Sequence, residues 1–200
     1  MKQLFLLLLL FSLSTISYSQ VDIGVKSGMN IATTKDLIQY PKNRIGWYCG
    51  AFARIPIYKK FFFQPELLYS SKGHKTTDLA GGEEITLRLN YINTPILFGY
   101  YIDKKTSILI GTELGYLLSA RGLLSNKVRF DQTDSYPKKI DLGLDIGIAY
   151  TIYKNFGIEI RYNYGFKHMY NTDANGIRRG ESLGGNRVFQ IGLHYRLPSS

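Results

Sequence analysis

The chain has 200 residues, of which 25 are Lys or Arg and 15 are Asp or Glu, so its formal net charge is +10. Its only cysteine, Cys49, excludes a disulfide framework and a cysteine-based metal site within one chain. A basic, tyrosine-rich chain invites comparison with nucleic-acid-binding proteins. Here the cations are scattered among carboxylates and the chain carries the export signal described next, so no nucleic-acid partner is expected.

Residues 1–19 are predicted to be a cleaved signal peptide. Lys2 gives the positive start, residues 4–13 form an apolar run, and Ser17-Tyr18-Ser19 is a small-x-small cleavage site before Gln20. A membrane anchor helix would need about 20 apolar residues, and this run is shorter. No cysteine follows the run, which argues against a lipid anchor. Residues 20–200 are expected to form one domain.

The mature chain contains eight stretches in which apolar residues alternate with polar residues or glycine. In residues 140–152 the even positions are Ile, Leu or Tyr, whereas the odd positions include Asp141, Gly143 and Asp145. Side chains alternate faces along a strand, so each stretch is predicted to be a strand with one apolar and one polar face. The expected strands are residues 21–33, 45–57, 61–72, 84–102, 106–122, 139–152, 156–167 and 187–197.

The connections between these strands alternate in length. Short ones, at residues 58–60, 103–105 and 153–155, alternate with longer ones at 34–44, 73–83, 123–138 and 168–186. Outer-membrane barrels join their strands by short periplasmic turns and longer external loops in the same way. The predicted fold is therefore all-β: an eight-stranded antiparallel up-and-down transmembrane β-barrel with both mature termini in the periplasm.

The charged face of each strand is expected to line the barrel interior, because a Lys or Arg facing lipid near the midplane costs about 2–4 kcal/mol. A soluble lipocalin-like barrel would alternate similarly. Glycines on the charged rows, which relieve crowding in a narrow barrel, favour the membrane barrel, as do aromatics at the two membrane boundaries. These aromatics are Phe61, Phe62, Phe63, Tyr100, Tyr101, Tyr150, Tyr153 and Tyr195 at one end and Trp47, Tyr69, Tyr91, Tyr164 and Phe166 at the other.

Two stretches fit this pattern less well. In residues 45–57, Tyr48 and Phe52 share a face with Arg54. Around residues 92–95 the phase of the alternation slips, which predicts a bulge or bend near Pro95.

The interior is predicted to hold a network of ten charged residues. Paired carboxylates can divide into acid and base, which is a catalytic possibility. We favour ion pairing with the interior cations, because buried charges need partners. Such a network would fill a lumen this narrow, so no general pore is expected. The predicted members are Lys26, Arg54, Glu66, Arg88, Glu113, Asp141, Asp145, Glu159, Arg161 and Arg196.

The histidines give no pattern typical of a metal or cofactor site. His74, His168 and His194 fall on two expected loops and one strand without ligand spacing, so no metal and no cofactor are expected. His168 shares a long loop with Asp173 and Ser182, which would suit a hydrolase or acyltransferase triad. No nucleophile motif accompanies these residues, and we expect no catalytic residues.

Cations outnumber acids in the expected external loops. At the outer rim, cations meet the phosphates of lipopolysaccharide, and arginine can bind phosphate through two hydrogen bonds. The alternative is ordinary solvated loop charge. The candidate lipopolysaccharide contacts are Lys42, Arg44, Lys127, Arg129, Arg178 and Arg179.

Several segments resemble the PorT-like proteins, a family of outer-membrane β-barrels. The most specific is QPELLYSSKG at residues 64–73; the others are GVKSGMN at 24–30, YINTP at 91–95 and IGLHYRL at 191–197. Asn93 stands where such proteins commonly have an acidic residue. The resemblance implies an eight-stranded barrel in a Gram-negative outer membrane, typically in Bacteroidota. PorT itself is associated with a protein-secretion system.

Taken together, these patterns predict a non-enzymatic integral outer-membrane protein that acts as a structural or interaction module with cationic external loops. Its expected partners are outer-membrane lipid, lipopolysaccharide and an envelope or secretion-machinery protein. The alternatives are a narrow channel and, third, a lipid acyltransferase or hydrolase. Fold alone does not decide between these functions.

Overall fold

The computed structural model describes residues 21–34, 42–77, 84–124, 128–131, 133, 139–166 and 185–198. The predicted signal peptide lies outside these residues. Within them, no helix is long and apolar enough to cross a membrane. The described strands are β1 (Asp22–Thr34), β2 (Lys42–Tyr58), β3 (Phe61–Thr77), β4 (Glu84–Tyr101), β5 (Thr106–Leu124), β6 (Arg129–Asp131), β7 (Ile140–Tyr153), β8 (Phe156–Gly165) and β9 (Asn186–Arg196).

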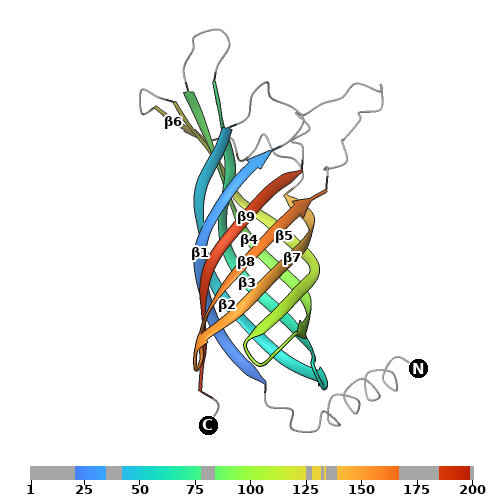
Figure 1. The fold of residues 1–200 in the computed structure, drawn as a ribbon. Helices are drawn as coiled ribbons and strands as arrows, with labels where there is room; N and C mark the ends of the chain where they lie inside the picture. Colours follow the sequence, from blue (N-terminus) through green and yellow to red (C-terminus); the bar gives the residue numbers. More distant parts are fainter. Residues whose placement is uncertain are drawn as a thin grey trace, which may run out of the picture.

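Eight of these strands form a closed antiparallel barrel, which confirms the predicted fold class (Figure 1). Each strand pairs with the next, in the order β1-β2-β3-β4-β5-β7-β8-β9, and β9 pairs with β1 to close the wall. At the closure, Ser27 is opposite Cys49 on one side and Leu193 on the other. The short β6 pairs only with residues 121–123 of β5 and extends that side of the barrel beyond the wall (Figure 1).

The wall has an apolar outer face and a polar inner face. On β2, Ile45 and Trp47 are 70% and 52% exposed, whereas Tyr48 is only 2% exposed and lies inside. The same alternation along the other strands leaves a continuous belt of Ile, Leu, Val, Phe and Tyr side chains exposed around the barrel. A soluble lipocalin-like barrel would have the opposite polarity, so the structure excludes that alternative.

The interior is polar in its middle and apolar toward each end. Arg54 lies over the ring of Phe62 at 4.4 Å, and Lys72 lies over the ring of Tyr91 at 5.4 Å. The polar middle of the lumen is therefore bounded by two small apolar clusters. The cluster near Arg54 contains Phe62, Leu97, Leu109 and Ala149, and the cluster near Lys72 contains Leu87, Leu89, Tyr91, Leu117 and Ala120.

These inward apolar side chains correct two predictions. β4 keeps a single phase from Leu87 to Gly99, so the bulge predicted near Pro95 is wrong. The irregularity lies in β5, where Leu118 is an extra residue between the partners of Asn90 and Tyr91. Tyr91, Phe62 and Tyr101, all predicted at membrane boundaries, face the interior.

The part of β2 that breaks the alternation in the sequence keeps one phase in the structure, and the register of β2 against β3 shifts only on either side of it, between Asn43 and Tyr48 and between Pro56 and Tyr58. Along β2, Tyr48, Phe52 and Arg54 all point inward. Their different polarity reflects their different depths in the lumen, and the backbone does not change phase between them.

Tight turns and close backbone packing complete the barrel. The turns that follow β2 and β7 each contain a lysine with positive φ, Lys59 at 46° and Lys154 at 47°. Gly192 of β9 is needed for a different reason. A Cβ atom there would overlap the hydroxyl of Tyr48 and approach the carbonyl oxygen of Ser27 within 2.6 Å.

Candidate functional site

Four charged side chains from three strands meet in the middle of the lumen. Lys26 of β1 donates to Glu66 of β3 at 3.0 Å and to Glu159 of β8 at 2.8 Å. Arg161, two residues beyond Glu159, donates to the same two carboxylates at 2.7 and 2.6 Å. We call these four residues the central quartet. It holds two positive and two negative charges, and each cation contacts both anions.

The quartet is extended by hydrogen bonds on one side. Gln64 Nε2 donates to Glu66 at 2.7 Å, and its Oε1 accepts from Arg54 Nε at 2.9 Å. Arg54 also donates to the Tyr101 hydroxyl at 3.2 Å. Alternate side chains of β2 and β3 therefore connect the quartet to the apolar cluster around Phe62.

A second charged group lies around Lys72. Its ammonium donates to Glu113 of β5 at 2.6 Å. Asp145 accepts from Asn163 at 2.7 Å and lies 3.6 Å from Arg161, which links this group to the quartet. Asp141 accepts from Asn186 at 2.7 Å.

Neutral polar residues connect the strands on the remaining side. Asn30 of β1 donates to Ser70 Oγ at 2.9 Å and accepts from Gln190 of β9 at 2.9 Å. His74 lies inside as well, with its Nδ1 3.1 Å from the hydroxyl of Thr34. His194 is buried beside the ring of Phe52.

The buried charges of the described residues balance. Five cations (Lys26, Arg44, Arg54, Lys72 and Arg161) and five carboxylates (Glu66, Glu113, Asp141, Asp145 and Glu159) are buried. Isolated ions would be costly at such positions, and paired, hydrogen-bonded ions offset much of that cost. The net positive charge of the chain therefore lies on other residues.

Two members of the predicted network lie elsewhere. Arg88 is exposed on the outer face of β4, because the inward positions of that strand are odd-numbered there. Arg196 is half-buried at the end of β9, where it lies 3.4 Å from Asp22. The other eight predicted members are buried within the barrel.

Of the predicted lipopolysaccharide contacts, one is buried, two are exposed and three lie outside the described residues. Arg44 is only 7% exposed, and it donates to the carbonyl oxygen of Lys72 at 2.7 Å, so it is not a loop cation. Lys42 and Arg129 are exposed at the ends of β2 and β6. Lys127, Arg178 and Arg179 lie outside the described residues, as do His168, Asp173 and Ser182.

Sequence reasoning missed several interior residues. Lys72 and His74 were assigned to a strand end and a loop, but β3 continues to Thr77. Counting every second residue from Glu66 would have found both, since Glu66, Leu68, Ser70, Lys72 and His74 are all buried. In the described part of the chain, no group of three or more His, Cys, Asp or Glu side chains is arranged to hold a metal ion.

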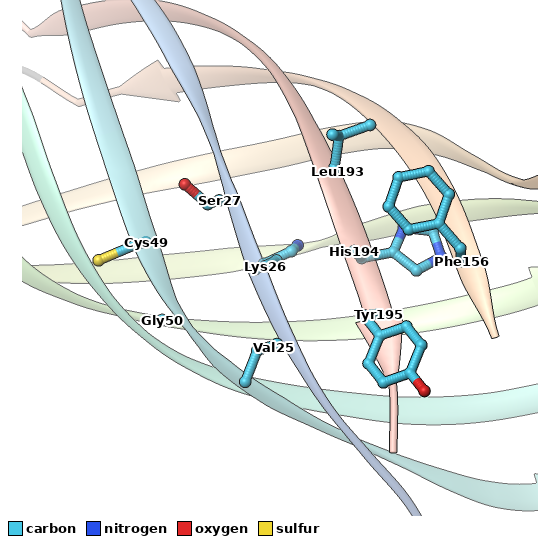
Figure 2. Close-up of a pocket in the computed structure, with 9 residues that line it drawn as sticks. All are labelled: Val25, Lys26, Ser27, Cys49, Gly50, Phe156, Leu193, His194 and Tyr195. Atoms are coloured by element: carbon cyan, nitrogen blue, oxygen red, sulfur yellow. The ribbon is translucent and has the colours of Figure 1, made fainter. Parts of the chain in front are cut away.

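A shallow hollow of about 420 Å³ lies in the barrel wall over β1, β2 and β9 (Figure 2). The hollow exists because Ser27, Cys49 and Gly50 are small, whereas Val25 and Tyr195 beside them are bulkier. Lys26 and His194 also border it, but they are buried, and its accessible lining is almost wholly apolar, so in a bilayer it would be filled by acyl chains.

A closed barrel of eight tilted strands, apolar outside and filled with paired charges inside, has the architecture of a transmembrane barrel of an outer membrane. The sequence profile of the family described as outer membrane protein beta-barrel domain matches residues 13–171. The chain belongs to this family.

Solved structures agree on the fold. Ail, the attachment invasion locus protein of Yersinia pestis, in complex with the heparin analogue sucrose octasulfate, is 16% identical with a TM-score of 0.51, covering 88% of this chain and 99% of that one. Neisserial surface protein A is 12% identical with a TM-score of 0.53, over 88% and 97%. OprG of Pseudomonas aeruginosa is 12% identical with a TM-score of 0.51, over 89% and 96%. A comparison with the sequences of curated proteins gives no match.

Proposed function

We propose that this outer-membrane protein is a non-enzymatic interaction module with a closed lumen. The observation that carries the proposal is the central quartet, in which Lys26 and Arg161 join strands from opposite ends of the chain across the interior. A lumen occupied by paired side chains has no continuous water path for solutes. The protein would then bind its partners at the two rims of the barrel.

The orientation of the barrel is part of the proposal. The turns at residues 59–60, 102–105 and 154–155 are short and polar, as periplasmic turns are. The chain would be exported by residues 1–19 and would fold as one domain over residues 20–200, with both ends in the periplasm. The opposite rim would face the cell exterior and contact lipopolysaccharide.

The protein partner is proposed from the PorT-like segments, above all residues 64–73. They support a subfamily typical of Bacteroidota, in which one member is associated with protein secretion. We therefore propose an envelope or secretion-assembly protein as partner, bound through the polar periplasmic end or the external loops.

The deciding experiment is cross-linking in cells followed by mild-detergent purification from outer membranes at native expression level. A reproducible partner in stoichiometric amount would support the interaction module and name the process. Recovery of the barrel with lipopolysaccharide alone would remove the secretion-assembly role and leave a structural role in the membrane. Discrete conductance steps in a planar bilayer would replace the module by the narrow channel.

A further inference from the structure

The outer rim contains two pairs of like charges directly opposite each other on neighbouring strands. Lys42 of β2 is opposite Lys75 of β3, and Arg88 of β4 is opposite Arg121 of β5. Directly opposed like charges destabilise a sheet unless something compensates them. A concentration of positive charge at this part of the rim therefore requires a reason.

Carboxylates of the protein compensate only some of these cations. Glu84 is 2.8 Å from Lys75 and 3.8 Å from Lys42. Asp131 of β6 is opposite Arg121. Among the described residues, no carboxylate lies within ion-pair distance of Arg88 or of Arg44.

Arg44 is the more unusual of these two cations, neither of which is paired with a described carboxylate. Its side chain is almost wholly buried, and its guanidinium donates to the carbonyl oxygen of Lys72 and, at 3.2 Å, to the hydroxyl of Ser71. These neutral acceptors hold the group in place without balancing its charge. A buried arginine without an anion is unfavourable, so the position favours binding of an anion from outside.

Arg44 and Arg88 line the same groove. This rim groove has a volume of about 460 Å³ and is bordered by polar groups of Asn43, Lys75 and Thr86. Ile45 and Leu123 provide its apolar edge. Because Lys75 is paired with Glu84, the described carboxylates leave two positive charges of the lining, those of Arg44 and Arg88, uncompensated. A phosphate monoester carries about −1.5 to −2 charges near neutral pH and suits that excess.

The depth of the groove indicates what carries the phosphate. Tyr116 on the outer face is opposite Ile92, and Arg88 lies four residues further along β4. At about 3.3 Å per residue and a tilt of about 40°, this raises Arg88 by roughly 10 Å above the tyrosine. Aromatic rings of this kind mark the membrane interface, so the groove lies at the level of lipid headgroups.

We propose that the rim groove binds a phosphate monoester on the headgroup of an outer-leaflet glycolipid. The Arg44 and Arg88 guanidinium groups would contact the phosphate oxygens, and Asn43 and Thr86 would contact neighbouring polar groups. The acyl chains would run down the outer face past Ile45 and Trp47, whose ring packs against that of Tyr69 at a centroid distance of 5.0 Å. This inference rests on the orientation in the proposed function and specifies the lipid contact.

The test measures lipid retention by native mass spectrometry on mature protein purified from outer membranes and exchanged into detergent. Three probes are compared: an acylated glucosamine disaccharide with one phosphate monoester, the same lipid without phosphate, and inorganic phosphate. The variant is Arg88→Gln, because an exposed position leaves the fold intact. Arg129→Gln is the matched control, since it removes one exposed rim cation outside the groove.

We expect wild type and Arg129→Gln to retain the phosphorylated lipid and Arg88→Gln to weaken retention by at least about tenfold, the value of one charge-assisted contact. If Arg88→Gln and Arg129→Gln lost lipid retention equally, binding would depend on diffuse rim charge, and the proposed site in the groove would be wrong. Inorganic phosphate competing at the same concentration as the lipid would overturn the glycolipid assignment. Retention of the dephosphorylated lipid would overturn the role of phosphate.

A further outcome separates this inference from the proposed function. If a correctly folded barrel from the outer membrane retained no lipid in any form, the groove would be refuted and the interaction module would stand. If the mature protein were absent from the outer-membrane fraction, the proposed function itself would fail.

Discussion

Replacing Arg161 by methionine would remove the cation that joins three buried carboxylates. Arg161 donates to Glu66 at 2.7 and 3.0 Å and to Glu159 at 2.6 Å, and it lies 3.6 Å from Asp145. Loss of one partner of a buried ion pair costs about 3–5 kcal/mol, because the remaining charge stays buried and uncompensated. We expect Arg161→Met to lower the free energy of unfolding by that amount.

A second variant tests whether the cost comes from charge imbalance. In Arg161→Met combined with Glu159→Gln, the remaining charges of the quartet are Lys26 and Glu66, which are 3.0 Å apart and stay paired. We expect this double variant to recover at least about half of the loss. A favourable coupling of this kind, up to about 3 kcal/mol, is typical of residues in one network.

The assay is equilibrium unfolding in guanidinium chloride of the mature barrel folded into lipid bilayers. Trp47 is the only tryptophan and lies on the lipid-facing surface, so its fluorescence reports transfer of the wall between lipid and water. Arg129→Gln, at an exposed site, should stay within about 0.5 kcal/mol of wild type. A loss below about 1 kcal/mol in Arg161→Met, or a double variant weaker than the single one, would refute the reasoning.

Three further predictions concern packing, pH and conductance. Gly192→Ala should destabilise the barrel by about 1–3 kcal/mol in the same unfolding assay, because its methyl group overlaps the Tyr48 hydroxyl. Gly143→Ala, whose nearest contact is a side-chain amide at 2.9 Å, should cost less, and the opposite order would contradict the packing argument. In the β4–β5 turn, backbone N–H groups of the next residues hold the pKa of Asp103 below its usual 3.8. A carboxyl group whose pKa is lowered by folding stabilises the fold above its unfolded-state pKa, and this contribution is lost as pH falls through the lower, folded-state pKa. Asp103→Ala should therefore lower the free energy of unfolding at pH 7 but not in acid. A loss of stability that did not change with pH would contradict this explanation. In planar bilayers, the wild-type protein should show no discrete conductance steps, whereas Arg161→Ala should show them. Conductance steps in the wild-type protein would refute the closed lumen.

The sequence was sufficient to predict the class of fold because a lipid-facing wall requires alternation along every strand. It predicted the rim less well. Arg44 lies at the end of a stretch expected to be a loop, so its inward position on β2 was not predicted. Arg88 is expected inside only if the charged row of every strand faces the lumen, but at that end of β4 the inward row is apolar and contains Leu87, Leu89 and Tyr91.

Partners within the lumen were beyond prediction for a different reason. The composition of the charged rows could be read along the chain, but the pairing of Glu66 with Arg161 depends on how far the strands are staggered around the barrel. At the apolar ends of the lumen, polarity does not identify the inward face. Inward Leu117 lies between the outward apolar residues Tyr116 and Leu118, and inward Leu89 lies between the outward polar residues Arg88 and Asn90. No local pattern in the sequence specifies depth.

The quartet has a consequence for how the barrel enters the membrane. Lys26 and Glu159 are 133 residues apart, and they meet only after β9 has paired with β1. An open sheet could keep the pairs Lys26–Glu66 and Arg161–Glu159, but it would lack the contacts of Lys26 with Glu159 and of Arg161 with Glu66. Each ion would then face lipid without its second partner, at a cost of up to several kcal/mol. Insertion and closure should therefore occur as one concerted step, with the earliest and latest strands of the chain joined before the wall reaches the hydrocarbon core. Such a barrel folds slowly by nature and depends on whatever holds its two edge strands together meanwhile.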